Sequence, residues 1–284
     1  MPHLNPTWQV AVAVAVLFLL TAAVTRWRGL TKTSAALTEA ALVVCLFAAW
    51  QVIGAATHRN VVGATSNALR VHRTETWLHL PSEFSLQQLV LPHSTLSQLA
   101  NGYYLYGHFN PIIVLLGWTW LRHRQHYPRL RLQLGLLTAL AFVVHAVPVA
   151  PPRLLPQLGF QDLALTYGQS VYGSFGAGIP GQLLAMPSLH VGWSVLVGWT
   201  VVRLGRTRWR WLALLHPVLM AVVVVVTANH WWLDGVVACG LLGLAIALAQ
   251  LVLWLLGRRP TAGRTAEAAG APGLAEAALL TPAA

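Results

Sequence analysis

Seven apolar stretches constrain this chain more than any other feature of its sequence. A helix that crosses a bilayer needs about 20 largely apolar residues, and each stretch approaches or exceeds that length. They cover residues 8–24, 35–56, 102–121, 132–150, 185–204, 211–228 and 231–256. We therefore predict an all-α integral membrane protein with about six to seven transmembrane helices.

The composition supports lipid as the solvent for most of the chain. Of the 284 residues, 56% are hydrophobic and only 9% are charged, whereas an ordinary soluble domain carries roughly 25% charged residues. The stretch at 8–24 lacks the basic segment and the small-residue cleavage pattern of a secretory signal, so we expect it to be retained as a helix.

The basic residues predict an orientation in the membrane. Fourteen of the 18 Lys and Arg residues follow the first, third, fifth and seventh stretches, whose following loops must share one side. The positive-inside rule places that side in the cytoplasm together with the C-terminus. The formal net charge of +11 is thus a topology signal and an anchor to anionic lipid, and we expect no nucleic-acid partner.

We expect three regions along the chain. Residues 1–100 should form N-terminal transmembrane helices and an outer connection, 57–101, that lies along the membrane interface as an amphipathic helix. Residues 101–257 should form the membrane core that carries the polar residues described below. Residues 258–284, which are rich in Ala, Gly, Pro and Thr, should form a disordered cytoplasmic tail.

An acidic residue within the last apolar stretch indicates function, because ionisable groups are costly in lipid. Asp234 follows His230 by four residues. If the helix begins near Asn229, the two side chains share one face, and the carboxylate can accept one imidazole N–H and leave the other nitrogen free to attack. The alternative is a carboxylate that only satisfies a buried histidine for packing.

Two further polar elements fall on the same predicted side. His190 lies within a turn of the outer boundary, since Pro187 suits the first turn of a helix. Helices that begin near His190 and His230 would both point their positive N-terminal ends at one outer pocket, which favours phosphate. Arg153 lies in an outer loop, and its planar guanidinium matches phosphate oxygens. Alone, Arg153 would be an interfacial anchor; together, the four residues predict a phosphoryl-transfer site.

Other interpretations of these residues stay open. His230 and Asp234 could ligate zinc, although no His-Glu-x-x-His or Cys ligand supports that site. A hydrolase triad of Ser188, His190 and Asp234 is disfavoured because residues two apart on a helix do not face each other. A transporter or lipid-binding protein could use the same groups as a proton relay, but relays lie near the membrane midplane.

Aromatic residues near the outer boundary have two interpretations. Tyr104 and His108 are spaced by four residues and could line a substrate pocket, or they could belong to an interfacial aromatic belt. Trp193, Trp231 and Trp232 are better explained as belt residues than as catalytic ones.

Three segments, 151–156, 185–193 and 227–234, resemble the motifs of the type 2 phosphatidic acid phosphatase (PAP2) superfamily. They are most similar to the branch of inositol phosphorylceramide synthase and bacterial inositolphosphotransferase-like proteins. The resemblance implies a PAP2-like helical bundle and a reaction through a covalent phosphohistidine, without metal or cofactor. It implies these roles: nucleophile His230, orienting carboxylate Asp234, general acid His190, and phosphate-binding Arg153 and Ser188.

Two departures from the superfamily pattern favour the synthase-like branch. Ala146 stands where the wider superfamily has a lysine, and Val223 and Val224 stand where it has a Ser-Arg pair. We therefore expect an enzyme that transfers a phosphoryl group or phospho-head group from a membrane lipid at the extracytoplasmic face, with a polyol or water as acceptor. The alternatives are a lipid phosphate or polyprenyl diphosphate phosphatase and, second, the non-enzymatic transporter or lipid-binding protein.

Overall fold

The computed structural model describes residues 7–57, 60–169 and 182–257. Throughout these residues the regular structure is helical, apart from one isolated parallel bridge between Val149 and Leu184. The predicted all-α fold is therefore confirmed. The helices are α1 (Thr7–Trp27), α2 (Thr31–Thr57), α3 (Val61–Trp77), α4 (Glu83–Val90), α5 (Ser94–Arg122), α6 (Tyr127–His145), α7 (Leu163–Thr166), α9 (Leu189–Leu204), α10 (Leu215–Val226) and α11 (Trp232–Gly257), with short turns η1 (Pro152–Leu154), η2 (Pro156–Leu158) and η4 (Arg208–Leu214).

The chain divides into two compact units at Ala249. The first unit contains every contact discussed below. The described part of the second unit is the end of α11, residues 250–257. The predicted disorder of the tail falls outside the described residues, and the predicted regions 1–100 and 101–257 stay a prediction.

Several helices are suited to cross a membrane. Four described segments have the required length and apolar composition, namely Trp8–Trp27, Thr31–Thr57, Arg208–Val226 and Trp232–Leu256. Helix α9 is apolar but shorter, while α5 and α6 bury polar side chains such as Asn101 and Gln133. The protein is a multi-pass membrane protein, and each of the seven predicted stretches contains a helix, although α6 ends at His145 and α9 begins at Leu189, inside their stretches.

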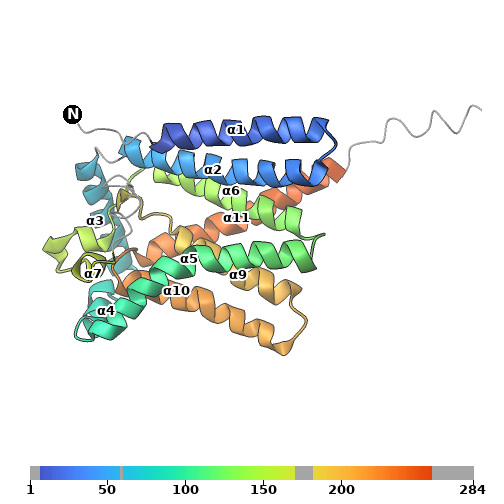
Figure 1. Ribbon diagram of the computed structural model, residues 1–284. Coiled ribbons are helices and arrows are strands. Elements are labelled where there is room, and N and C mark those ends of the chain that lie inside the picture. The colour runs from blue at the N-terminus through green and yellow to red at the C-terminus, as the bar shows by residue number, and fades with distance from the viewer. Residues whose placement is uncertain (1–6, 58–59, 170–181, 258–284) are drawn as a thin grey trace, which may run out of the picture. The chain divides into compact units, whose positions relative to one another are not determined.

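Helices α1 and α2 form an antiparallel hairpin held by small residues (Figure 1). On α2, Ser34, Ala41 and Ala48 are buried at intervals of seven residues, and the Ser34 hydroxyl donates to the Ala22 carbonyl at 2.8 Å. Small side chains let helix backbones approach closely where lipid removes the hydrophobic drive for association. The other side of α2 packs on α6.

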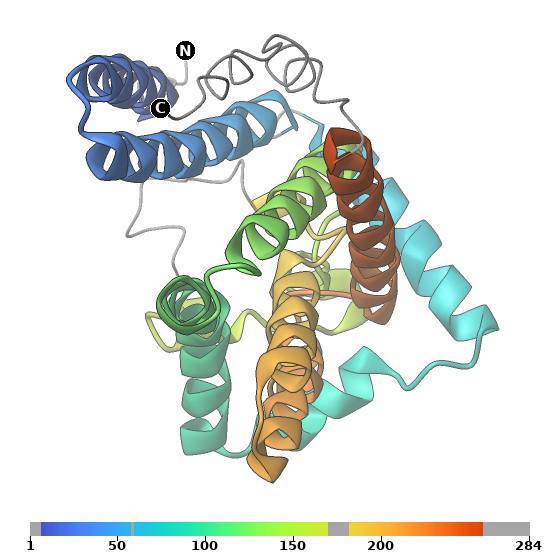
Figure 2. The same ribbon diagram turned by 90° about the vertical axis from the view of Figure 1, so that its right-hand side faces the viewer.

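Helices α5, α6, α9, α10 and α11 form the core around the site (Figures 1 and 2). Helix α9 contacts α5, α6 and α10, and its Leu196 and Val197 share an apolar cluster with Leu242 and Ala245 of α11. The amphipathic helices α3 and α4 and the short α7 lie at one end of these helices (Figure 1). Side-chain caps from Asn60 and Ser82 begin α3 and α4.

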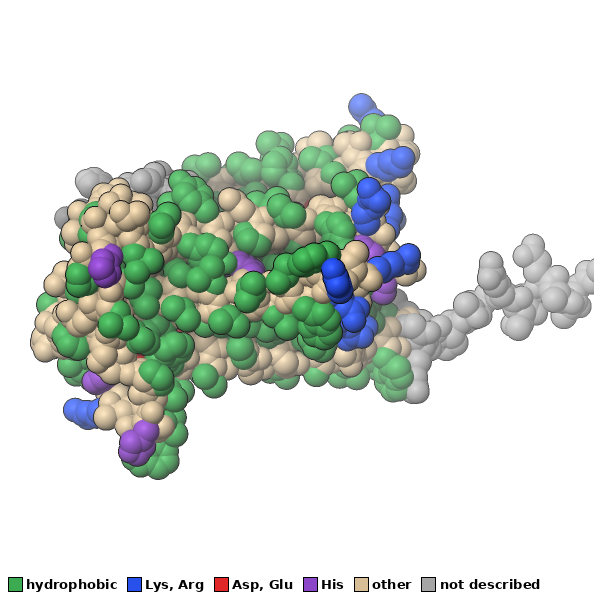
Figure 3. All heavy atoms as spheres, turned by 90° about the horizontal axis from the view of Figure 1, so that it is seen from below, with side chains coloured by type: hydrophobic (Ala, Val, Ile, Leu, Met, Phe, Trp, Pro, Cys, Tyr) green, Lys and Arg blue, Asp and Glu red, His purple; other side chains and the backbone are tan. Residues whose placement is uncertain are grey.

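Lys and Arg side chains gather at the opposite end (Figure 3). They belong to three turns and to the helix ends that flank them: between α1 and α2, between α5 and α6, and between α9 and η4. The predicted separation of the basic loops from the segments that carry His190 and His230 is thus present in the arrangement of the helices.

Close approach of α9 to the η4–α10 segment depends on Gly198. A Cβ at this position would lie 3.1 Å from the Ala213 carbonyl oxygen and 3.3 Å from the Pro217 ring. We predict that Gly198→Leu lowers the midpoint of thermal unfolding in detergent, since overpacking costs roughly 1–3 kcal/mol. Gly117→Leu is the matched control because no atom lies within 4 Å of its Cβ position. Equal shifts in the two variants would contradict this account of the packing.

Candidate active site

Two loop segments meet along a short stretch of paired backbone. The Val149 amide donates to the Leu183 carbonyl at 2.9 Å, and the Ala185 amide donates to the Val149 carbonyl at 3.1 Å. These bonds bring the segment that carries Arg153 alongside the segment that leads into His190.

The segment before α11 and the first turn of α11 join both of these loops. The Arg153 amide donates to the Ala228 carbonyl at 2.9 Å, and the Ser188 amide donates to the Asp234 carbonyl at 3.0 Å. Backbone amides buried away from water need partners, and here each loop supplies partners for the others. The three predicted motif segments are therefore parts of one structure.

Trp231 lies at the centre of this arrangement. Its side chain is fully buried, its Nε1 donates to the Ala150 carbonyl at 3.0 Å, and Phe160 packs edge-on at 5.9 Å between ring centroids. The prediction that Trp231 belongs to an interfacial belt is wrong, because its indole fills the space between the three segments. Trp193 is also engaged internally, since its ring stacks on His108 at 4.5 Å.

Helix α11 begins later than predicted. Ala228 has a positive φ of 54°, which turns the chain before the helix starts at Trp232. Asn229 does not cap α11; its side-chain Nδ2 instead donates to the Thr227 hydroxyl at 2.9 Å. His230 therefore precedes the helix, yet the Asp234 carboxylate reaches back to it and also accepts from the Trp231 amide at 2.9 Å.

The contacts of His230 define which ring nitrogen carries the proton. Its Nδ1 lies 2.8 Å from the Ala185 carbonyl oxygen and 3.2 Å from Asp234 Oδ2. Both neighbours are acceptors, so Nδ1 must be the protonated nitrogen. This tautomer leaves the lone pair of Nε2 available for attack on an electrophile.

His190 lies in the first turn of α9 beside His230, with 5.5 Å between the ring centroids. Tyr104 and His108 of α5 each stack on His190 at 4.1 Å. Two rings cannot stack on the same face, so the imidazole of His190 is held between them. Both predicted pocket residues therefore contact the predicted general acid.

Ser188 is the N-cap of α9. Its buried hydroxyl oxygen accepts from the Val191 amide at 3.3 Å, which satisfies a donor that the helix cannot. The hydroxyl proton is still available for donation to a phosphate oxygen. Its predicted phosphate contact stays a prediction.

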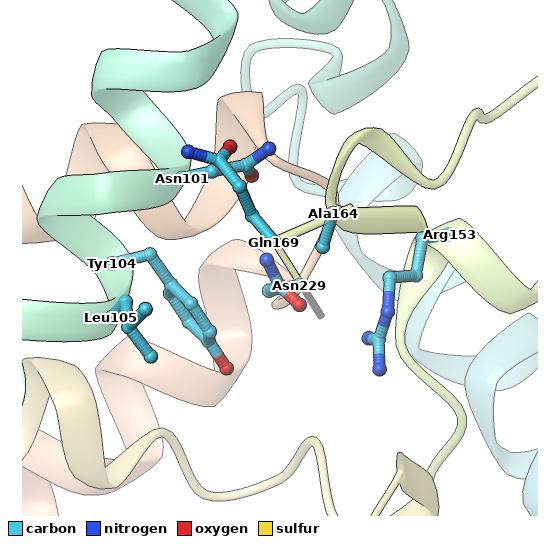
Figure 4. Close-up of a pocket in the computed structure, with 7 residues that line it drawn as sticks. All are labelled: Asn101, Tyr104, Leu105, Arg153, Ala164, Gln169 and Asn229. Atoms are coloured by element: carbon cyan, nitrogen blue, oxygen red, sulfur yellow. The ribbon is translucent and has the colours of Figure 1, made fainter. Parts of the chain in front are cut away.

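Arg153 and Tyr104 line one small cavity (Figure 4). Its complete lining is Asn101, Tyr104, Leu105, Arg153, Ala164, Gln169 and Asn229. Figure 4 shows Tyr104 and Arg153 on either side of Asn229, the residue before His230. The Arg153 Nε lies 3.2 Å from Asp162 Oδ2, and this ion pair fixes the buried guanidinium at the cavity wall.

A protein-family profile described as the PAP2 superfamily matches residues 69–248, which is more than half of the chain. The chain belongs to the PAP2 superfamily. Members are phosphatases and phosphotransferases of lipid phosphates, so the protein is expected to act on a membrane lipid. No curated protein and no solved structure matched the chain.

The PAP2 match includes all the site residues and the positions at which the chain departs from the superfamily pattern. Val224 is buried in an apolar cluster with Val191 and Met220, and its carbonyl accepts from the amides of Asn229 and His230 at 3.0 and 3.1 Å. This position therefore shapes the turn before His230 through packing and backbone contacts, and supplies no phosphate-binding charge.

Several residues that contact the site were missed from the sequence. Asp162 and Gln169 lie in a loop without periodicity, and Asn101 resembles any polar residue near a helix end. His145, with its Nε2 3.3 Å from the Pro187 carbonyl oxygen, lies within the stretch 132–150 and is the last residue of α6. The available signal was the rarity of ionisable groups within apolar stretches, which pointed to Asp234 and applies equally to His145.

We predict that Asp234→Asn lowers turnover by about 10⁴-fold, the loss found when the orienting carboxylate of a Ser-His-Asp triad is replaced by its amide. An amide can donate toward Nδ1 of His230 and so favour the tautomer with the proton on Nε2. Turnover and thermal unfolding should be measured together, with Glu39→Gln as the control because that carboxylate pairs with Arg131 on α6. Turnover of Asp234→Asn within tenfold of wild type would contradict the orienting role.

Proposed function

We propose that the protein transfers a phosphoryl group or phospho-head group from a membrane lipid through a phosphohistidine on His230, as an inositolphosphotransferase-like member of its superfamily. The observation that carries this proposal is the pair of acceptors at His230 Nδ1, the Ala185 carbonyl and the Asp234 carboxylate. They leave Nε2 as the nucleophile, with the ring of His190 beside it.

The arrangement supports two successive displacements at phosphorus. In the first, His230 Nε2 forms a bond to phosphorus while the bond to the lipid oxygen breaks, and protonated His190 gives that oxygen its proton. In the second, neutral His190 takes the proton of an acceptor hydroxyl as its oxygen attacks phosphorus and the bond to His230 breaks. Positioning and charge stabilisation supply most of the catalysis in such reactions, and Arg153 is the cation placed to bind the phosphate oxygens.

The cavity beside Arg153 favours a hydroxyl-bearing head group. Asn101 is buried, and neither its Oδ1 nor its Nδ2 has a partner among the described residues. Buried amides without partners are costly, and an amide offers both a donor and an acceptor. A hydroxyl group both donates and accepts hydrogen bonds, so a head-group hydroxyl would satisfy this amide. With water as the phosphoryl acceptor, the protein would be a lipid phosphatase, the alternative function.

We further propose that the site faces the extracytoplasmic side. On α9, His190 and Arg203 are separated by 13 residues, or about 20 Å of helix at 1.5 Å per residue, so the site and the cationic end lie at opposite ends of one helix. The positive-inside rule then assigns the cationic end, with the C-terminus, to the cytoplasm.

The proposed reaction predicts a specific pattern of labelled products. Purified protein in detergent is given phosphate-labelled phosphatidate, a polyprenyl diphosphate or phosphatidylinositol, each with and without free inositol. We expect label on the polyol in wild type, and a loss on the order of 10⁴-fold or more in His230→Ala, as found for other nucleophile replacements. Chelators should leave the rate unchanged.

Each other outcome of this assay is informative. Release of free phosphate regardless of the polyol would assign the phosphatase function. Unchanged turnover in His230→Ala would remove the proposed nucleophile. Absence of any reaction in wild type across the lipid panel would contradict the enzymatic assignment in favour of a transporter or lipid-binding protein.

The proposed orientation predicts which loops a membrane-impermeant reagent reaches. With Cys45 and Cys239 replaced by alanine, Gln157→Cys at the site end should react with an impermeant maleimide in intact cells. Gln125→Cys, in the turn between α5 and α6, should react only after the cells are permeabilised, since both positions are exposed on the structure. The reverse pattern would place the site in the cytoplasm.

A further inference from the structure

Two buried glutamates lie outside the catalytic residues described so far. Glu75 on α3 and Glu83 on α4 are only 2% and 3% exposed, although Arg70 and Arg73 on the same α3 are exposed. Burial of a carboxylate is costly unless it is paired or protonated. These side chains are therefore not ordinary polar residues of an amphipathic helix.

Glu75 contacts the first turn of the helix that carries Asp234. Its Oε1 accepts from the Leu233 amide at 2.7 Å, while Asp234 Oδ2 accepts from the Trp231 amide. The first amides of a helix have no partner within the helix. Two carboxyl groups, one from α3 and one from α11, thus accept hydrogen bonds from backbone amides of the turn that directly follows His230.

One buried oxygen of each glutamate has no donor among the described residues. Among the described residues, Glu75 Oε2 and Glu83 Oε1 are buried and no N–H or O–H group of another side chain or the backbone donates to them. The carboxylate ion pairs found in the described residues are those of Glu39, Asp162 and Asp234. Two neighbouring buried carboxyls satisfy one another when one of them is protonated and donates to the other.

The surroundings of Glu75 favour the protonated form. Burial, the hydrogen bond to Glu83 and the negative charges of Glu83 and Asp234 together raise the pKa of Glu75 to about 9, although the Leu233 amide opposes the shift. The other titratable groups nearby are His230, which faces Asp234, and His72 of α3, whose ring packs on Trp231 at 5.5 Å.

We propose that Glu75 is a positioning residue that acts as a neutral acid: it donates to Glu83, accepts from Leu233, and so holds the turn that places His230 and Asp234. The expected effect of Glu75 on turnover rests on the proposed function. The expected effect of Glu75 on protein stability does not, and it can be tested separately. Ionisation of Glu75 would put a second negative charge beside Asp234 and weaken the hold on this turn.

The pH dependence has a definite sign. The pKa of Glu75 is raised on folding, so its contribution to stability is fully present below the pKa of an unfolded glutamate, about 4.3, and is lost as the pH rises through about 9. Glutamine at this position imitates the neutral acid at every pH, because its amide donates to Glu83 and its oxygen accepts from Leu233.

The test compares Glu75→Gln and Glu75→Ala with Glu39→Gln, which removes a carboxylate paired with Arg131 away from this cluster. We expect Glu75→Gln to keep turnover at pH 7 within about threefold, and Glu75→Ala to lose about 10- to 100-fold in kcat with KM nearly unchanged, the signature of lost positioning. The ratio of Glu75→Gln to wild-type turnover should rise as the pH passes about 9.

Thermal unfolding gives a readout that does not require turnover. The unfolding midpoint of wild type should fall more steeply between pH 6 and 10 than that of Glu75→Gln, whereas Glu39→Gln should follow wild type. Identical pH dependence in wild type and Glu75→Gln would overturn the proposal, even if Glu75→Ala fails to fold. A wild-type kcat in Glu75→Ala would overturn the positioning role of Glu75 and leave the proposed function intact. Wild-type turnover in His230→Ala would overturn the proposed function instead.

Discussion

Hydrogen bonding among three irregular segments is the constraint on which the rest of the site depends. Backbone that is neither helix nor strand is tolerated at membrane depth only where protein supplies its partners. Here the segments around Val149, Ala185 and Ala228 supply partners to one another, and Trp231 fills the space between them. This pairing also positions His230, because Ala185, whose amide donates to the Val149 carbonyl, accepts a hydrogen bond from His230 Nδ1 through its own carbonyl.

The ionisable groups of the site follow the same rule as the backbone. Buried charges are stable only when they are paired with good geometry, and the site contains two such pairs: His230 with Asp234, and Arg153 with Asp162. Aromatic stacking performs a similar task for His190, which α5 holds between two rings. These side chains are thus held by contacts within the protein itself, and preorganised groups of this kind favour phosphoryl transfer.

The parts of this structure that depend on local sequence were predictable. The length of the hydrophobic stretches predicted the helices, and the four-residue spacing of His230 and Asp234 predicted that their side chains meet. The late start of α11 at Trp232 was not predictable, because a turn at Ala228 and an acceptor 45 residues away in sequence, Ala185, decide it. Likewise Glu75 and Leu233 are 158 residues apart in the sequence, and the hydrophobic periodicity of α3 cannot predict a hydrogen bond between residues so far apart.

The central claim is that phosphorus is bonded to His230 during turnover. The most direct test mixes wild-type protein with a reactive lipid, quenches in alkali within the first turnover, and locates the adduct by peptide mass spectrometry. The account predicts an alkali-stable, acid-labile phosphorus adduct on His230 that disappears when the acceptor alcohol is added. Product formation at the same rate with His230 unmodified, or with the adduct on another residue, would contradict it.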